Sequence, residues 1–146
     1  MAKDLTVNDY LLSKIDLYEN DIDIINAPEA PLKAINLIKP KIKLDEYFYE
    51  WLGIWLAEGS WRKSEFIFTI GLSEERLAKR IQFLTNKVFG LSSNIHKRID
   101  HNTQVIQINS IHLNNFFEEL FEIKSSEINQ WNKWIPSKLL HCAPYK

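Results

Sequence analysis

Residues 45–58 carry apolar side chains at a helical spacing. These fall three or four positions apart at Phe48, Trp51, Leu52, Trp55 and Leu56, which predicts an amphipathic helix. Asp45 precedes this run as a candidate N-cap, and Glu46 stands in the first turn, where the helix dipole favours an acid. Gly59 is expected to end the helix, which leaves Glu58 as its last residue.

The next two segments alternate apolar and polar residues, the pattern of half-buried strands. In the first segment Phe66, Phe68 and Ile70 alternate with Ile67, Thr69 and Gly71, and residues 60–63 are the expected hairpin partner. Further along the chain, residues 94–100 and 103–109 predict a second hairpin, with its turn at residues 100–102.

Helical spacing returns after each hairpin. A helix is predicted from Ser73 as N-cap to Gly90, with its apolar face at Leu77, Ile81, Leu84 and Val88. Another is predicted after Ser110, with Leu113, Phe116, Phe117, Leu120 and Phe121 on one face. A last helical stretch, residues 125–134, is expected to stop before Pro136, because proline disfavours helix in the residue before it.

The chain therefore divides into a leader, residues 1–44, and a core, residues 45–146. Pro28, Pro31 and Pro40 indicate an irregular or extended leader, in which residues 6–15 could form a short helix capped by Thr6 or Asn8. The core has the order αββαββα, which predicts an α+β fold with a saddle of antiparallel strands and the helices on one face. The other face of the sheet is free for binding.

Composition narrows the class of protein. The chain has 146 residues, of which 45% are hydrophobic and 25% charged, which is ordinary for a globular domain. A single cysteine, Cys142, excludes an internal disulfide framework and a cysteine-rich zinc site. No apolar run approaches the roughly 20 residues of a membrane span, and the first residues lack a signal peptide. We expect an intracellular protein, cytoplasmic or nuclear, without a membrane partner.

The net charge is −1, from 18 basic and 19 acidic residues. A nucleic-acid-binding protein usually carries an excess of basic residues. Any such function must therefore depend on how the charges are distributed, since residues 1–45 sum to −2 and the rest to +1.

The segment WLGIWLAEG, residues 51–59, combines a smooth helix face with a terminal carboxylate. Gly53 and Ala57 stand four positions apart, and small residues at this spacing let two helix backbones approach closely. Two such helices would bring two Glu58 carboxylates together, and paired carboxylates can hold Mg²⁺ at a phosphodiester. The alternative is an ordinary amphipathic helix with a surface glutamate near its C-terminus, a placement that the helix dipole disfavours.

This segment resembles the motif of the LAGLIDADG homing endonucleases, in the form found in intein-encoded members. Glu58 falls on the family's acidic metal ligand, and Gly53 and Ala57 fall on its small helix-packing positions. The order αββαββα, the segment IQINSIHLNNFFEEL, and KWIP at residues 133–136 resemble further parts of the family core. Lys133 falls on the active-site lysine of many intein-type members.

The resemblance implies a site-specific endonuclease that cleaves double-stranded DNA with Mg²⁺. Glu58 would be the metal ligand, with the carbonyl of Ala57 as a further ligand, and Lys133 would stabilise the charge that develops on the phosphate. The motif occurs once in the chain, so the second carboxylate must come from another copy or from a missing continuation. We expect a homodimer through the helix 46–58, with Gly53 and Ala57 at the interface.

The resemblance also leaves alternatives open. The chain could be a catalytically inactive DNA-binding or RNA-maturase module on the same fold, or a fragment of a larger intein. Self-splicing is not expected, since position 1 is neither Cys nor Ser and no His-Asn pair ends the chain.

Strand alternation also sorts the candidate DNA contacts. If the phenylalanines of the first hairpin face the helices, the opposite face of the sheet carries polar and basic side chains that suit base edges in a major groove. These expected DNA-binding residues are Arg62, Ser64, Thr69, Asn94, His96, Arg98, Thr103 and Gln107.

Overall fold

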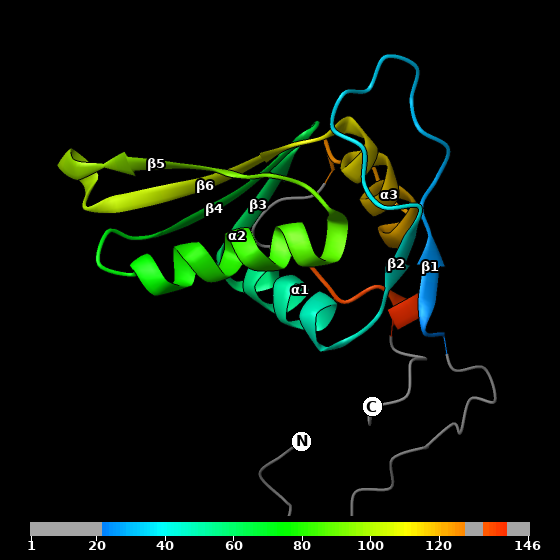
Figure 1. Ribbon diagram of the computed structural model, residues 1–146, viewed down its shortest axis with the longest axis horizontal. Helices are drawn as coiled ribbons and strands as arrows, with labels where there is room; N and C mark the ends of the chain where they lie inside the picture. The colour runs from blue at the N-terminus through cyan, green and yellow to red at the C-terminus, as the bar shows by residue number, and fades with distance from the viewer. Residues whose placement is uncertain (1–21, 128–132, 140–146) are drawn as a thin grey trace, which may run out of the picture.

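The computed structural model describes residues 22–127 and 133–139, and it is an α+β fold built on antiparallel strands (Figure 1). The helix expected near Thr6 and Asn8 lies outside the described residues. The elements are, in chain order, β1 (Ile24–Asn26), β2 (Lys41–Lys43), α1 (Glu46–Glu58), β3 (Gly59–Arg62), β4 (Glu65–Gly71), α2 (Glu75–Phe89), β5 (Asn94–Arg98), β6 (Thr103–Asn109) and α3 (Ile111–Phe121).

Helix α1 begins and ends where the sequence predicts. The Asp45 carboxylate accepts hydrogen bonds from the backbone N–H groups of Tyr47 and Phe48, and so caps the helix N-terminus. Gly59 is the C-cap, where the backbone turns to an extended conformation, and a Cβ atom there would lie 2.3 Å from Cδ1 of Trp55, so the position accepts only glycine. The chain therefore passes directly from α1 into β3, which leaves Glu58 at the corner between the two elements.

Four strands form the main sheet in the order β3-β4-β6-β5, and each pair of neighbouring strands is antiparallel. Phe66 pairs with Ile108 and Phe68 with Ile106, so these four buried side chains lie on one face. Helices α1 and α2 lie beneath this sheet in Figure 1, and β5 and β6 extend beyond them as a long hairpin. The core is aromatic, with Trp51, Trp55 and Phe117 packed against this inner face.

Two details of the sequence prediction are wrong: the N-cap of α2 and, in its described part, the last predicted helix, residues 125–134. The N-cap position of α2 is Glu74 and not Ser73, and no side chain caps it, because the Glu74 carboxylate accepts the backbone N–H of Gly71 instead. After α3, the described residues 125–127 form a turn and 133–134 are irregular. The last predicted helix is therefore absent from the described part of its range.

The described part of the leader is built into the core. Strands β1 and β2 form a small antiparallel sheet of their own, and Ile38 and Ile42 are buried with the core side chains. His112 of α3 ties the same segment down, since its Nδ1 accepts the backbone N–H of Ile38 at 3.3 Å. The proline pattern correctly indicated an extended segment, but it carried no signal for this packing.

None of the described helices has both the length and the apolar character needed to cross a membrane.

Candidate active site and nucleic-acid interface

The structure brings Lys133 to the C-terminal end of α1, beside Glu58. Lys133 Nζ donates hydrogen bonds to the carbonyl oxygen of Trp55, at 2.9 Å, and to that of Gly59, at 2.7 Å. The same ammonium group lies 5.3 Å from the centre of the Trp55 ring. The residues expected to be catalytic, 75 positions apart in the chain, therefore meet at one corner of the fold.

The electrostatics of this corner favour a cation. The last turn of α1 has no basic residue of its own, and the negative end of a helix dipole attracts positive charge. Burial lowers the pKa of Lys133, and the nearby Glu58 carboxylate opposes that shift. Two of the three ammonium N–H groups are used by carbonyls, which leaves one for another acceptor.

Few oxygen ligands for a metal ion lie at this corner of the described chain. Glu58 is exposed at the end of α1 and offers the hard carboxylate oxygens that Mg²⁺ prefers. The Ala57 carbonyl belongs to the last four of the helix, which have no acceptor role within it. Among the described residues, no group of three or more His, Cys, Asp or Glu side chains could hold a metal ion. At this corner the described residues therefore offer one carboxylate, Glu58, and the free carbonyl of Ala57.

The expected helix interface is open on the surface of α1. Gly53 and Ala57 are both exposed, and a Cβ atom added to Gly53 would meet nothing within 4 Å. The aromatic face of the helix points the other way, since Trp51 and Trp55 are fully buried. The small residues therefore remain available to a second backbone.

Strand pairing places the expected DNA-binding residues on one face of the sheet. In one row Thr69 pairs with Val105 and Val105 with His96, and in the next Ile67 pairs with Gln107 and Gln107 with Asn94. Directly paired residues share a face. Arg98 and Thr103 form a third row. Residues within a strand that are two positions apart also share a face, so all three rows lie opposite the helices.

The remaining two candidates lie at the β3–β4 hairpin. Arg62 pairs with Glu65, two positions along β4 from Ile67, so it joins the same face, and Ser64 lies in the turn. Gln107 Nε2 lies within hydrogen-bonding distance of Glu65 Oε1, at 3.3 Å. Two apolar residues, Ile67 and Val105, also lie on this outer face; strand alternation predicts the place of both, although neither was among the expected DNA contacts.

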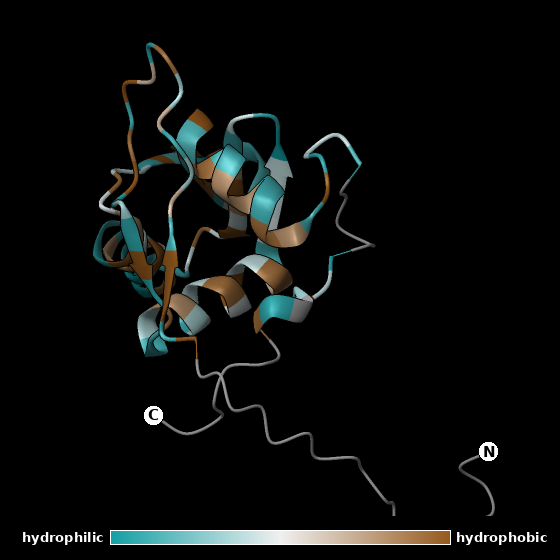
Figure 2. Cartoon of the chain, turned by 90° about the vertical axis from the view of Figure 1, so that its right-hand side faces the viewer, coloured by the Kyte–Doolittle hydropathy of each residue, from teal (hydrophilic) through white to brown (hydrophobic). Residues whose placement is uncertain are grey.

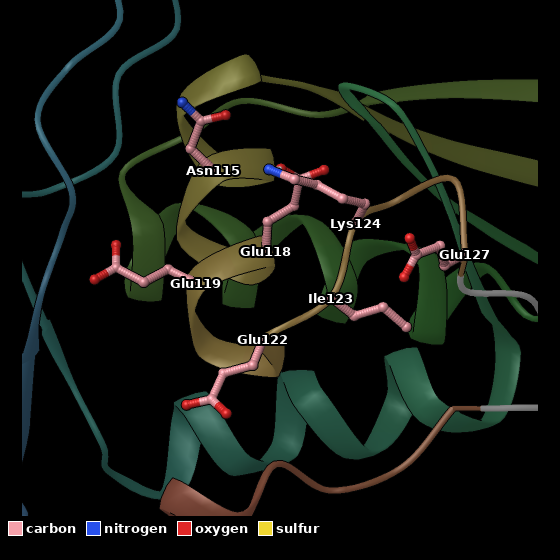
Figure 3. A pocket seen from close by; sticks show the side chains of 7 residues that line it. All are labelled: Asn115, Glu118, Glu119, Glu122, Ile123, Lys124 and Glu127. Carbon is pink, nitrogen blue, oxygen red and sulfur yellow. The ribbon is translucent and has the colours of Figure 1, made fainter.

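A surface hollow of about 580 Å³ lies against α3 and the turn that follows it (Figure 3). Four glutamates line it, and Glu118 Oε2 lies 3.2 Å from Lys124 Nζ. Such a lining would repel phosphate, so this hollow is no candidate for a nucleic-acid site. Its residues are Asn115, Glu118, Glu119, Glu122, Ile123, Lys124 and Glu127.

Comparison with known proteins gives one informative similarity. No family model matches the chain. Over 153 aligned residues, the chain is 28% identical to an uncharacterized protein of Methanocaldococcus jannaschii. The alignment covers 100% of this chain but 19% of that relative, so the chain spans about a fifth of the relative's length.

Proposed function

We propose that the chain is a unit of a metal-dependent, site-specific DNA endonuclease of the LAGLIDADG type. The observation that carries this proposal is the meeting of Lys133 and Glu58 at the end of α1, where Lys133 Nζ contacts the Gly59 carbonyl at 2.7 Å. A cation and a carboxylate at one exposed corner suit phosphodiester chemistry, since phosphate charge and a divalent metal both need neutralising partners.

In this proposal the open face of the sheet binds double-stranded DNA. A two-stranded β-ribbon fits the major groove, and the long β5–β6 hairpin offers His96 and Arg98 in that arrangement. Arg62, at the other hairpin, would contact the same duplex. This distribution of side chains is compatible with DNA binding at a net charge of −1. Arg62, His96 and Arg98 share the face with one strand acid, Glu65, while the four glutamates of the hollow beside α3 lie apart from it.

The chain's own residues have distinct parts in the reaction. Glu58 and the Ala57 carbonyl would hold Mg²⁺, which when bound polarises the phosphate and lowers the pKa of water. Lys133 would direct its remaining N–H toward the scissile phosphate and stabilise the charge that builds there. Its two carbonyl contacts limit the positions that the ammonium group can take.

A complete site needs a second carboxylate. A homodimer through α1 would supply it, with Gly53 and Ala57 in contact across the interface. The alternative source is a further part of a larger protein, and the short span of this chain within its M. jannaschii relative favours that alternative. Either arrangement uses the same face of α1.

The test is a cleavage screen with Mg²⁺ on a randomised double-stranded DNA library, with Glu58→Gln beside the wild type. The exchange keeps the size of the side chain and removes its charge. We expect cleavage to be lost, while DNA binding and thermal stability stay unchanged. Glu46→Gln, at the opposite end of the same helix, is the matched control and should cleave normally.

Three outcomes are decisive. Cleavage by Glu58→Gln at the wild-type rate would show that the carboxylate is not a metal ligand. DNA binding without cleavage by the wild type, in any oligomeric state, would favour a catalytically inactive module. Preferential binding of structured RNA over duplex DNA would favour an RNA-maturase role.

A further inference from the structure

The loop that joins β1 to β2 has a defined position in the fold. Its neck is closed by a 2.8 Å hydrogen bond from the Ala27 N–H to the Pro40 carbonyl. The His112 ring bridges its two sides, with Nε2 2.9 Å from the Pro28 carbonyl and Nδ1 accepting from the Ile38 N–H. These contacts fasten both sides of the loop to the first turn of α3.

The tip of this loop presents apolar side chains to solvent. Leu32 is 97% exposed and Ile35 is 93% exposed. The Ala34 N–H donates to the Pro31 carbonyl at 3.0 Å and Lys33 has a φ of 70°, which is the conformation of a type II turn. Two large apolar side chains three positions apart on one turn form a local apolar patch, and exposed apolar patches mark surfaces that contact another molecule.

This tip lies beside the open face of the sheet. In Figure 1 the loop rises past α3 on the side of the sheet away from α1 and α2, and Figure 2 shows apolar segments along the raised loop. Asn36 Nδ2 donates to the carbonyl of Asn109, the last residue of β6. The Ser110 N–H donates to the Ser64 carbonyl, so the loop and the β3–β4 turn meet at one corner.

The chemistry of the tip suits nucleic acid. Lys33 stands between the two apolar side chains and takes part in no ion pair within the described part of the chain. At the opposite end of the sheet, the β5–β6 turn carries Ile99, which is 78% exposed. Thus the three most exposed large apolar side chains of the described residues lie at the two ends of the face proposed for DNA.

We propose that the tip of the loop, residues 31–35, is a second DNA-contacting element that binds duplex beyond the footprint of the sheet. Leu32 and Ile35 contact sugars and base edges in the minor groove, where apolar side chains act as wedges, and Lys33 pairs with a phosphate. This inference rests on the proposed function, since it extends the same binding face.

The test uses a double variant that carries both Leu32→Ser and Ile35→Ser. Its affinity for two duplexes is compared with that of the wild type. One has about 12 base pairs, little more than one helical turn, and the other about 30 base pairs. We expect affinity for the long duplex to fall roughly a hundredfold, about tenfold for each of the two large apolar side chains removed from the interface. Affinity for the short duplex should not change.

Two further variants complete the experiment. Ile24→Ser, at a half-exposed position on β1, is the control and should bind both duplexes normally. Lys33→Gln should reduce the slope of log K against log salt by about one on the long duplex.

An equal loss on both duplexes, or no loss on either, would overturn the flanking contact while the proposed function stands. Self-association of the wild type that the double variant abolishes without DNA would assign the tip to a second copy. A wild type that binds neither duplex would contradict both proposals.

Discussion

Lys133, near the end of the chain, contacts the C-terminal end of α1, the first helix of the core. Its ammonium group supplies the positive charge that the last turn of α1 lacks in its own sequence, and it lies against the Trp55 ring. Burial lowers its pKa, which is the cost of placing a cation in this corner. The contacts with the Trp55 and Gly59 carbonyls offset that cost, so Lys133 has a structural role beside the proposed catalytic one.

Exchange of Lys133→Met tests this structural role. Methionine keeps much of the aliphatic stem but donates no hydrogen bond, so we expect the free energy of unfolding to fall by about 1–2 kcal/mol. Urea denaturation measures the change. Glu58→Gln should show no comparable loss, because Glu58 is exposed. If Lys133→Met were as stable as the wild type, the carbonyl contacts would not contribute to folding.

At the scale of elements, local capping residues fix where helices begin, and ion pairs between side chains join one helix to another. Asp45 and Ser110 cap α1 and α3 as the sequence predicts. Helices α1 and α2 are joined by an ion pair that no local pattern indicates, in which Arg80 Nε donates to Glu50 Oε1 at 2.8 Å. The hydrogen bond from Arg80 lowers the pKa of Glu50.

The pH dependence of stability reports on this pair. Because the pKa of Glu50 is lowered in the folded state, its contribution is present above the unfolded pKa and is lost as pH falls through the folded pKa. Both side chains are more than a third exposed, so Glu50→Gln should cost only about 0.5 kcal/mol at neutral pH and low salt. The variant and the wild type should converge in acid. A difference that persists below the folded pKa would mean that the charge of Glu50 is not responsible.

For the whole molecule, polar, acidic and small side chains lie on separate surfaces. The sheet has a helix-covered face and a mainly polar face, and the acids of α3 gather around a separate hollow. A Cβ atom added to Gly53 of α1 would meet nothing within 4 Å. A second helix can therefore reach the α1 backbone without displacing any side chain at Gly53.

Exchange of Gly53→Leu tests assembly. The position is exposed, so the monomer should keep its fold, whereas a leucine between two closely packed backbones typically costs about 1–3 kcal/mol. We expect the wild type to dimerise and this variant to be monomeric in analytical ultracentrifugation. Glu46→Gln serves again as the control. A wild type that stays monomeric at high concentration, with and without DNA, would favour a larger protein as the source of the second carboxylate.

The sequence by itself determined the helices α1, α2 and α3, the two hairpins and the face of the sheet opposite the helices, because capping, spacing and alternation are local properties. It also singled out Glu58, from its place at the end of a helix with a smooth face, and Lys133, through resemblance alone. Tertiary structure alone decided that Lys133 binds the carbonyls of α1, since those residues are far apart in the chain. It likewise decided that the leader contributes Ile42 to the core and raises an apolar loop. Burial and long-range hydrogen bonding depend on which segments meet in space, and no local pattern encodes that.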